Sequence, residues 1–402
     1  MDPATARKLT FAIAPFVAAT LVGMILMWPS GTTIEPPAGS SLATTRYSAG
    51  VTAVDRAPCD QAGQEGFDCA VVTARLAEGP DEGEEVFLNV AESPSGRRIQ
   101  VGDNILLGHA EEGVPGQQYY FQDFERSGSL VVLVALFAAV VIALSRWRGV
   151  TSLIGLAASL VILLSFVLPA ILDGSSPVLV ALVGGAAIMF VTLYLAHGFN
   201  AMTTTALLGT LGSLAITGIL AVVFVEAARF TGFGSEEATF LQFAAQQVNL
   251  QGLLLGGIVI GTLGVLDDVT VTQASAVWEL HRADPTLGAS GLYRAAIRIG
   301  RDHIASTVNT LVLAYAGASL PLLILFSLSD GSFTAVVTSE VVAEEIVRTL
   351  VGSIGLVASV PITSALAALV ASGEKGSALI RRKKAADGFK RPRGEGFFRD
   401  AE

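Results

Sequence analysis

The chain has 402 residues, 52% of them hydrophobic and 15% charged, with a formal net charge of −10 and a mean hydropathy of +0.61. This composition is too apolar for a soluble globular protein and favours a membrane-spanning one. We expect its partners to be the lipid bilayer and a small solute or ion, and we expect no nucleic-acid partner.

Apolar runs of membrane-spanning length recur along the chain. We predict eight spanning helices. Seven is the alternative count, because the second run is short and the fourth and fifth are separated only by His197-Gly198-Phe199-Asn200. The predicted spans are Leu9–Trp28, Ser129–Leu144, Thr151–Leu172, Val178–Ala196, Ala201–Val225, Leu253–Val271, Ile304–Ser327 and Ile346–Ala371.

The first apolar run has the basic start of a signal peptide, but no small-x-small cleavage site follows it in Met27-Trp28-Pro29-Ser30. We therefore predict that residues 1–29 form an uncleaved transmembrane anchor. The predicted seven-helix bundle covers residues 127–373, and residues 374–402 form a basic tail.

Residues 30–126 form the predicted soluble domain. They carry 16 Asp and Glu against 6 Arg. Short alternating segments separated by Gly, Pro and Asp turns predict five strands, and so a small extracytoplasmic all-β domain of the barrel or OB type. The predicted strands are Tyr47–Val54, Cys69–Ala74, Glu85–Val90, Asn104–Gly108 and Gln118–Phe124.

Two cysteines, Cys59 and Cys69, flank a polar loop of this domain. In an oxidising compartment we expect them to form a disulfide. A single cysteine pair with no nearby histidine is too few ligands for zinc, and the acids show no EF-hand spacing. We therefore predict no metal site and no cofactor.

Positive charges set the predicted orientation. All five lysines and most arginines, including those of the tail, are cytoplasmic if the N-terminus is cytoplasmic. An even number of spans returns the C-terminus to the same side. We predict a multi-pass protein of the cell membrane with both termini cytoplasmic and residues 30–126 outside.

The run from Gly252 to Glu279 carries the main functional signal. It begins as an apolar helix and continues into Asp267-Asp268. At 100° per residue, the small and polar residues of this run gather within about 80° of one another. These residues are Gly257, Gly261, Gly264, Asp268, Thr272 and Ser275. We predict that the three glycines form a helix-packing stripe with one carboxylate set into it.

Acids inside a spanning helix cost on the order of 2.5–3.5 kcal/mol each and mark a functional site by default. The alternative is that the helix has already left the bilayer at the acids. The small, apolar pattern beyond them, through Val269, Val271 and Ala274, favours the first interpretation. Asp267 and Asp268 are thus the leading candidates for an ion relay.

The next span is also rich in polar groups. Asp302, His303, Asn309 and Thr310 lie on adjoining faces of one predicted helix and are further relay candidates. Ordinary interhelical hydrogen bonds, worth roughly 0.6 kcal/mol each, explain the hydroxyl groups but not two carboxylates.

Several segments resemble the YibE/F family of bacterial multi-pass membrane proteins. They read HGFN, LLLGGIVIGTLGVLDDVTVTQASAVWEL, IGRDHIASTVNTLVLAYAGASLPLL and GLVASVPIT. This resemblance implies a permease of unknown substrate. The stretch GTLGVLDDVTVTQASAVWEL is also similar to the paired-acid helix of resistance-nodulation-division exporters and of SecD and SecF. That similarity implies a proton relay through Asp267 and Asp268. Here the second pseudo-repeat of those exporters is missing, and a homo-oligomer would supply it.

Two functions remain open, and a third is disfavoured. The chain is a permease or secondary transporter coupled to protons or cations, or it is a membrane assembly or export-accessory factor whose ectodomain holds a partner. We expect no enzymatic activity. Asp-Asp-Val-Thr-Val lacks the third acid of a lipid-phosphate metal motif, and there is no Walker A, G-x-S-x-G or zinc spacing.

Overall fold

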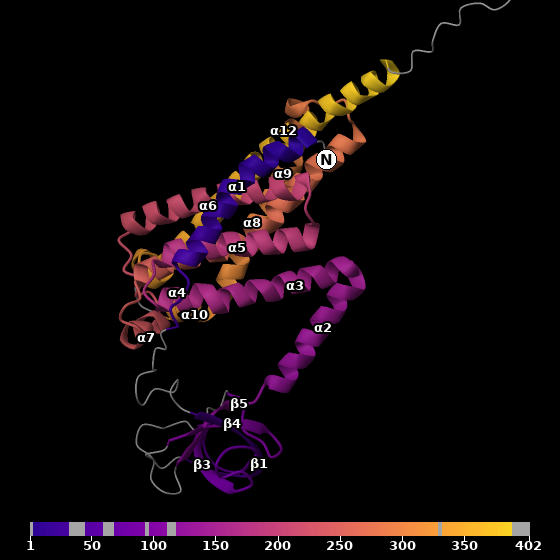
Figure 1. Ribbon diagram of the computed structural model, residues 1–402. Helices are drawn as coiled ribbons and strands as arrows, with labels where there is room; N and C mark the ends of the chain where they lie inside the picture. The colour runs from indigo at the N-terminus through magenta and orange to yellow at the C-terminus, as the bar shows by residue number, and fades with distance from the viewer. Residues whose placement is uncertain are drawn as a thin grey trace, which may run out of the picture. The chain divides into compact units, whose positions relative to one another are not determined.

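The computed structural model describes residues 3–31, 45–58, 68–92, 96–110, 118–328 and 332–387, with side chains described only as far as Gly373 in the last helix. The chain divides into two compact units (Figure 1). One comprises Met1–Thr32 with Trp147–Glu402, and the other Thr33–Arg146.

The first unit is helical. Its helices are α1 (Pro3–Leu26), α3 (Trp147–Ile162), α4 (Leu168–Leu172), α5 (Pro177–His197), α6 (Ala201–Ala227), α7 (Glu236–Ala244), α8 (Leu250–Ala283), α9 (Ala289–Ala318), α10 (Leu320–Ser327), α11 (Phe333–Val337) and α12 (Glu340–Asp387). A π-helical turn, Leu163–Val167, joins α3 to α4. Among the described residues of the whole chain, seven helices are long and apolar enough to cross a membrane, and an eighth arises if α9 and α10 form one span. The length and apolar composition of these helices fit the predicted membrane class.

The span predicted at Ile304–Ser327 is not one straight helix. α9 ends at Ala318, and α10 starts at Leu320 with a bend of 66° between them. Pro321 explains the break, because it has no N–H to donate and its ring crowds the carbonyl of Gly317, four residues earlier. The prediction missed the bend by following hydrophobicity alone.

The bundle core is built by α5, α6, α8 and α12, which lie together in Figure 1. α6 and α12 approach most closely at two reciprocal pairs. A Cβ built at Gly209 of α6 would collide with Thr363 of α12, and one built at Gly355 of α12 would collide with Thr217 of α6. Small residues therefore set this contact, as in membrane helix packing generally.

The predicted glycine stripe of α8 takes no part in these close helix contacts. Gly257, Gly261 and Gly264 are exposed, and a Cβ at Gly257 or Gly264 would meet nothing within 4 Å. At Gly261 the nearest atom is the Tyr315 hydroxyl, at 3.3 Å. Within the described part of one chain, no helix backbone covers the stripe, so these glycines do not pack α8 into its own bundle.

The second unit contains one antiparallel sheet and α2 (Ser127–Ser145). The strands are β1 (Thr45–Pro58), β2 (Asp68–Leu76), β3 (Glu85–Glu92), β4 (Asn104–His109) and β5 (Tyr119–Phe124), hydrogen-bonded in the order β3-β2-β1-β4-β5. All five predicted strands are confirmed. The hydrogen-bonded order has two ends, so the domain is a half-barrel and not a closed barrel. α2 groups with this unit, whereas the sequence assigns it to the bundle.

The predicted disulfide involves Cys59, which lies outside the described residues. Cys69 lies in β2, opposite Ala57 of β1. The Cys59–Cys69 disulfide therefore stays a prediction.

A buried ion pair lies at one side of the sheet. Glu92 is 5% exposed and accepts from the Arg56 Nε at 2.8 Å and from the backbone N–H of Ile99 at 2.8 Å. The hydrogen bond from Arg56 is the main reason that the pKa of Glu92 lies below its usual range. Removing one partner of such a pair leaves an uncompensated buried charge.

Acidic pH is expected to loosen β2 and β3 through Glu92. A carboxyl whose pKa is lowered by folding stabilises the fold fully above its unfolded pKa, and this stabilisation is lost as the pH falls through the folded pKa. We expect hydrogen exchange of the β2–β3 amides, corrected for intrinsic rates, to accelerate as the pH falls below about 4. Arg56→Gln should flatten that pH dependence. An unchanged profile in Arg56→Gln would show that the ion pair is not the cause.

Candidate functional site

The acidic pair lies near the middle of a long helix. α8 has 34 residues and begins where the Asn249 side chain accepts from the Gly252 N–H at 2.7 Å. At 1.5 Å per residue, Asp267 and Asp268 stand about 22–27 Å from either end. The helix therefore continues well past the acids, as the sequence pattern predicts.

The two acids point to different surroundings. Asp267 is half-buried, and its Oδ1 is buried without a hydrogen-bond partner. Asp268 is exposed, next along the helix from the uncovered glycine stripe. Leu266 and Val269, which flank the pair, are fully buried. Asp267 thus carries the unsatisfied buried oxygen, whereas the sequence pattern favours Asp268.

Buried hydrogen bonds hold α8 to its neighbours within about one and a half turns beyond the pair. Thr270 of α8 and Thr210 of α6 share a hydrogen bond of 2.6 Å. The Gln273 Nε2 donates to the Ala296 carbonyl of α9 at 2.8 Å and to the Ser364 Oγ of α12 at 2.7 Å. Gln273 is 2% exposed. These bonds tie α8 to α6, α9 and α12, three of the helices packed against it.

The four relay candidates on α9 differ in their exposure. Asp302, Asn309 and Thr310 are exposed, and the Thr310 hydroxyl donates to the Ser306 carbonyl of its own helix at 3.0 Å. His303 is half-buried, and its Nε2 is buried without a hydrogen-bond partner. Among the described residues, no hydrogen bond or ion pair joins these four side chains to Asp267 or Asp268. Their relay role stays a prediction.

Sequence reasoning missed Gln273 and the partners of Thr210 and Thr270. A glutamine in the interior of a long apolar helix is the available signal, because a buried amide must find hydrogen-bond partners. Its partners come from α9 and α12, 23 and 91 residues further along the chain. These partners can be identified only from the packed bundle.

Gln273→Leu is expected to destabilise the bundle by about 1–3 kcal/mol, because it removes two interhelical hydrogen bonds at nearly constant volume. The free energy of unfolding in mixed micelles measures this effect. Thr272→Val is the matched control, since Thr272 is exposed on the same helix turn. Equal stabilities of the two variants would contradict a structural role for the Gln273 network.

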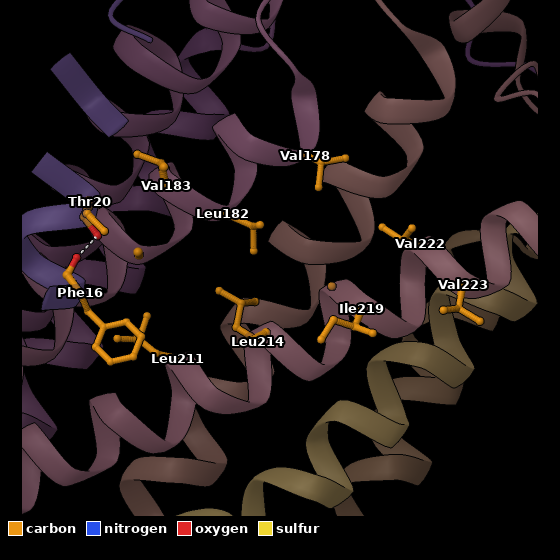
Figure 2. A pocket seen from close by; sticks show the side chains of 14 residues that line it. Phe16, Thr20, Val178, Leu182, Val183, Leu211, Leu214, Ile219, Val222 and Val223 are labelled. Atoms are coloured by element: carbon orange, nitrogen blue, oxygen red, sulfur yellow. Dashed lines mark hydrogen bonds between the residues drawn. The ribbon is translucent and has the colours of Figure 1, made fainter. Parts of the chain in front are cut away.

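An apolar hollow of about 570 Å³ lies between α1, α5 and α6, away from the acidic pair (Figure 2). Its single hydroxyl, that of Thr20, donates to the Phe16 carbonyl at 2.8 Å. No charged residue is among the described side chains that line it. The hollow therefore offers no group that could bind an ion.

The described residues contain no group of three or more His, Cys, Asp or Glu side chains placed to hold a metal ion. The carboxylates that could bind an ion in this site are therefore those of Asp267 and Asp268. A single carboxylate with an open oxygen can bind a proton or one monovalent cation, together with hydroxyl or carbonyl oxygens nearby.

Comparison with protein families bears on the helical part of the chain. A family model described as YibE/F-like protein matches residues 133–373. The chain belongs to the YibE/F-like protein family. The match runs from α2 to the membrane part of α12 and includes both acids of α8, and it confirms the resemblance stated from the sequence. No curated protein and no solved structure matches the chain.

Proposed function

We propose that this YibE/F-like protein is a secondary transporter, or permease, coupled to protons or cations through Asp267. The observation that carries the proposal is the buried Oδ1 of Asp267, which has no hydrogen-bond partner near the middle of α8. A buried carboxylate with an unpaired oxygen is costly in its charged form. It therefore favours binding a mobile proton or cation.

The neighbouring acid takes a second role in this proposal. Asp268 stands one residue along the helix and faces outward beside Gly264 and Thr272. Its carboxylate adds a negative charge next to Asp267, which favours a bound cation there. The similarity to the paired acids of resistance-nodulation-division exporters supports the same assignment.

A second copy of the chain completes the proposal. The exposed stripe of Gly257, Gly261 and Gly264 allows close backbone approach, which no helix of the described chain exploits. Packing of a second chain there would also remove Asp268 from lipid. We place the protein in the cell membrane with both termini cytoplasmic.

Inverted membrane vesicles test the coupling. An ATP-driven pH gradient is formed and followed with a fluorescent amine, and inorganic cations, amino acids and organic cations are then added one at a time. We expect at least one solute class to dissipate the gradient only in vesicles containing the protein. If none does, and if deletion of residues 30–126 instead blocks assembly or export of other envelope proteins, the accessory-factor function gains support.

A further inference from the structure

A second cavity, which unlike the first is polar, lies between α7, the α9–α10 bend and the first turns of α12. Its volume is about 930 Å³, within the range of small-molecule sites. Apolar side chains form much of its wall: Phe233, Pro321, Leu322, Leu325, Phe326 and Val341. The charged side chains that line it are Glu236, Glu237, Glu344, Glu345 and Arg348.

The lining is acidic, and most of its charges are already accounted for. Arg348 Nη1 contacts Glu345 Oε1 at 3.0 Å. Glu236 and Glu237 stand exposed in the first turn of α7, where solvent and the helix N-terminus stabilise a negative charge. Two buried atoms of the charged lining residues have no hydrogen-bond partner, the Oε1 of Glu344 and the Nε of Arg348.

Glu344 is 8% exposed, and its Oε1 is buried without a hydrogen-bond partner. Its neighbour one turn earlier, Glu340, instead accepts from the backbone N–H groups of Thr231 and Gly232 at 2.6 and 2.9 Å. The Glu344 carboxyl lies against Gly234, where a Cβ would come within 2.5 Å of its Oε2. The backbone N–H of Gly234 donates to this carboxyl, and Arg348 lies near it with a positive charge, but Oε1 itself accepts no hydrogen bond. A buried acceptor oxygen without a donor is costly unless a ligand supplies the donor.

We propose that this cavity binds an amphiphilic primary ammonium ion, with the ammonium donating to Glu344 and the apolar body lying on the wall of α10. Four glutamates against one arginine select a cation. The unpaired acceptor selects a cation that carries N–H groups. The volume and the apolar wall favour an organic ion, because a bare metal ion would neither fill the cavity nor contact its apolar side chains.

As a statement about binding, the inference is independent of transport. As a statement about cargo, it rests on the proposed transport function. The two are separable, because Glu344 lies in α12 and the coupling carboxylate Asp267 lies in α8. Asp267→Asn should keep ammonium binding even where it abolishes coupled movement.

Equilibrium binding of tritiated phenethylamine to the full-length protein in lipid nanodiscs tests the proposal. We expect saturable binding that phenethyl alcohol and 3-phenylpropionate displace at least about tenfold less well than unlabelled phenethylamine. Glu344→Gln should raise the Kd about tenfold or more, because it removes a charge-assisted hydrogen bond. Glu237→Gln, which removes the same charge at the exposed rim, should leave the Kd within about twofold.

Three results would overturn the site. They are absence of saturable binding to the wild type, equal displacement by the neutral alcohol, and equal Kd values for wild type and Glu344→Gln. An equal loss in Glu237→Gln would also overturn it, since it would reduce the effect to surface charge. If Glu344→Gln does not fold, Gly234→Ala replaces it, because its added methyl displaces the Glu344 carboxyl. If that variant does not fold either, the ligand series measured on the wild type decides.

Discussion

Asp267→Asn is expected to reduce gradient-driven flux to the level of vesicles lacking the protein. The amide keeps the size of the side chain but cannot bind or release a proton at physiological pH. Asp267 carries the buried oxygen without a partner, so the coupling ion has no alternative acceptor at that position. The measurement is dissipation of an imposed pH gradient by whichever solute the wild type responds to.

Asp268→Asn is the matched control, because it removes the same charge one residue away on an exposed face. We expect it to slow flux while leaving coupling in place, and Asp267→Glu to retain partial flux. If Asp268→Asn alone abolishes flux while Asp267→Asn does not, the roles are reversed. If both variants behave as wild type, the acids are structural and the transport proposal fails.

Gly209→Leu is expected to destabilise the bundle by at least about 3 kcal/mol, because a large side chain would be forced between α6 and α12. A Cβ at Gly209 already collides with the Thr363 side chain and comes within 3.3 Å of the Thr363 Cα. Since that atom is backbone, rotation of one side chain cannot relieve the clash. Unfolding in mixed micelles, or the yield of monodisperse protein, measures the loss.

Gly264→Leu provides the control and tests the predicted packing stripe. Nothing lies within 4 Å of a Cβ at Gly264, so the single chain should fold normally. If a second copy packs on the stripe, Gly264→Leu should instead shift the protein to monomers in native mass spectrometry or light scattering. A folding defect as large as that of Gly209→Leu would show that the stripe packs within the chain.

The β domain was predicted closely because its signals are local. Alternation along Tyr47–Val54 and turns such as Glu78-Gly79-Pro80-Asp81 place strands without knowledge of their partners. Closure into a barrel is not local, since it depends on which strand pairs with the last. The sheet ends at β3 and β5, so the barrel expectation was met only as a half-barrel.

The acidic pair shows where residue types suffice and where they do not. Two carboxylates in an apolar helix mark a site whatever the fold, because burying them is costly. Which of them is buried depends on where α6, α9 and α12 lie around α8. An exposed stripe and a packed face look alike in the sequence when both are rich in small residues. The sequence therefore predicts packing at Gly257, whereas the close contacts lie at Gly209 and Gly355.

By itself, the sequence predicted the apolar helices and their approximate positions, predicted the five strands, and indicated Asp267-Asp268 as a candidate site. These follow from hydrophobicity, periodicity and the cost of charge in lipid, which act over a few turns of chain. Only the tertiary structure decided which face of α8 is buried, the partners of Gln273 and the cavity at Glu344. Each of these depends on atoms far apart in the chain, which become neighbours only when the helices pack.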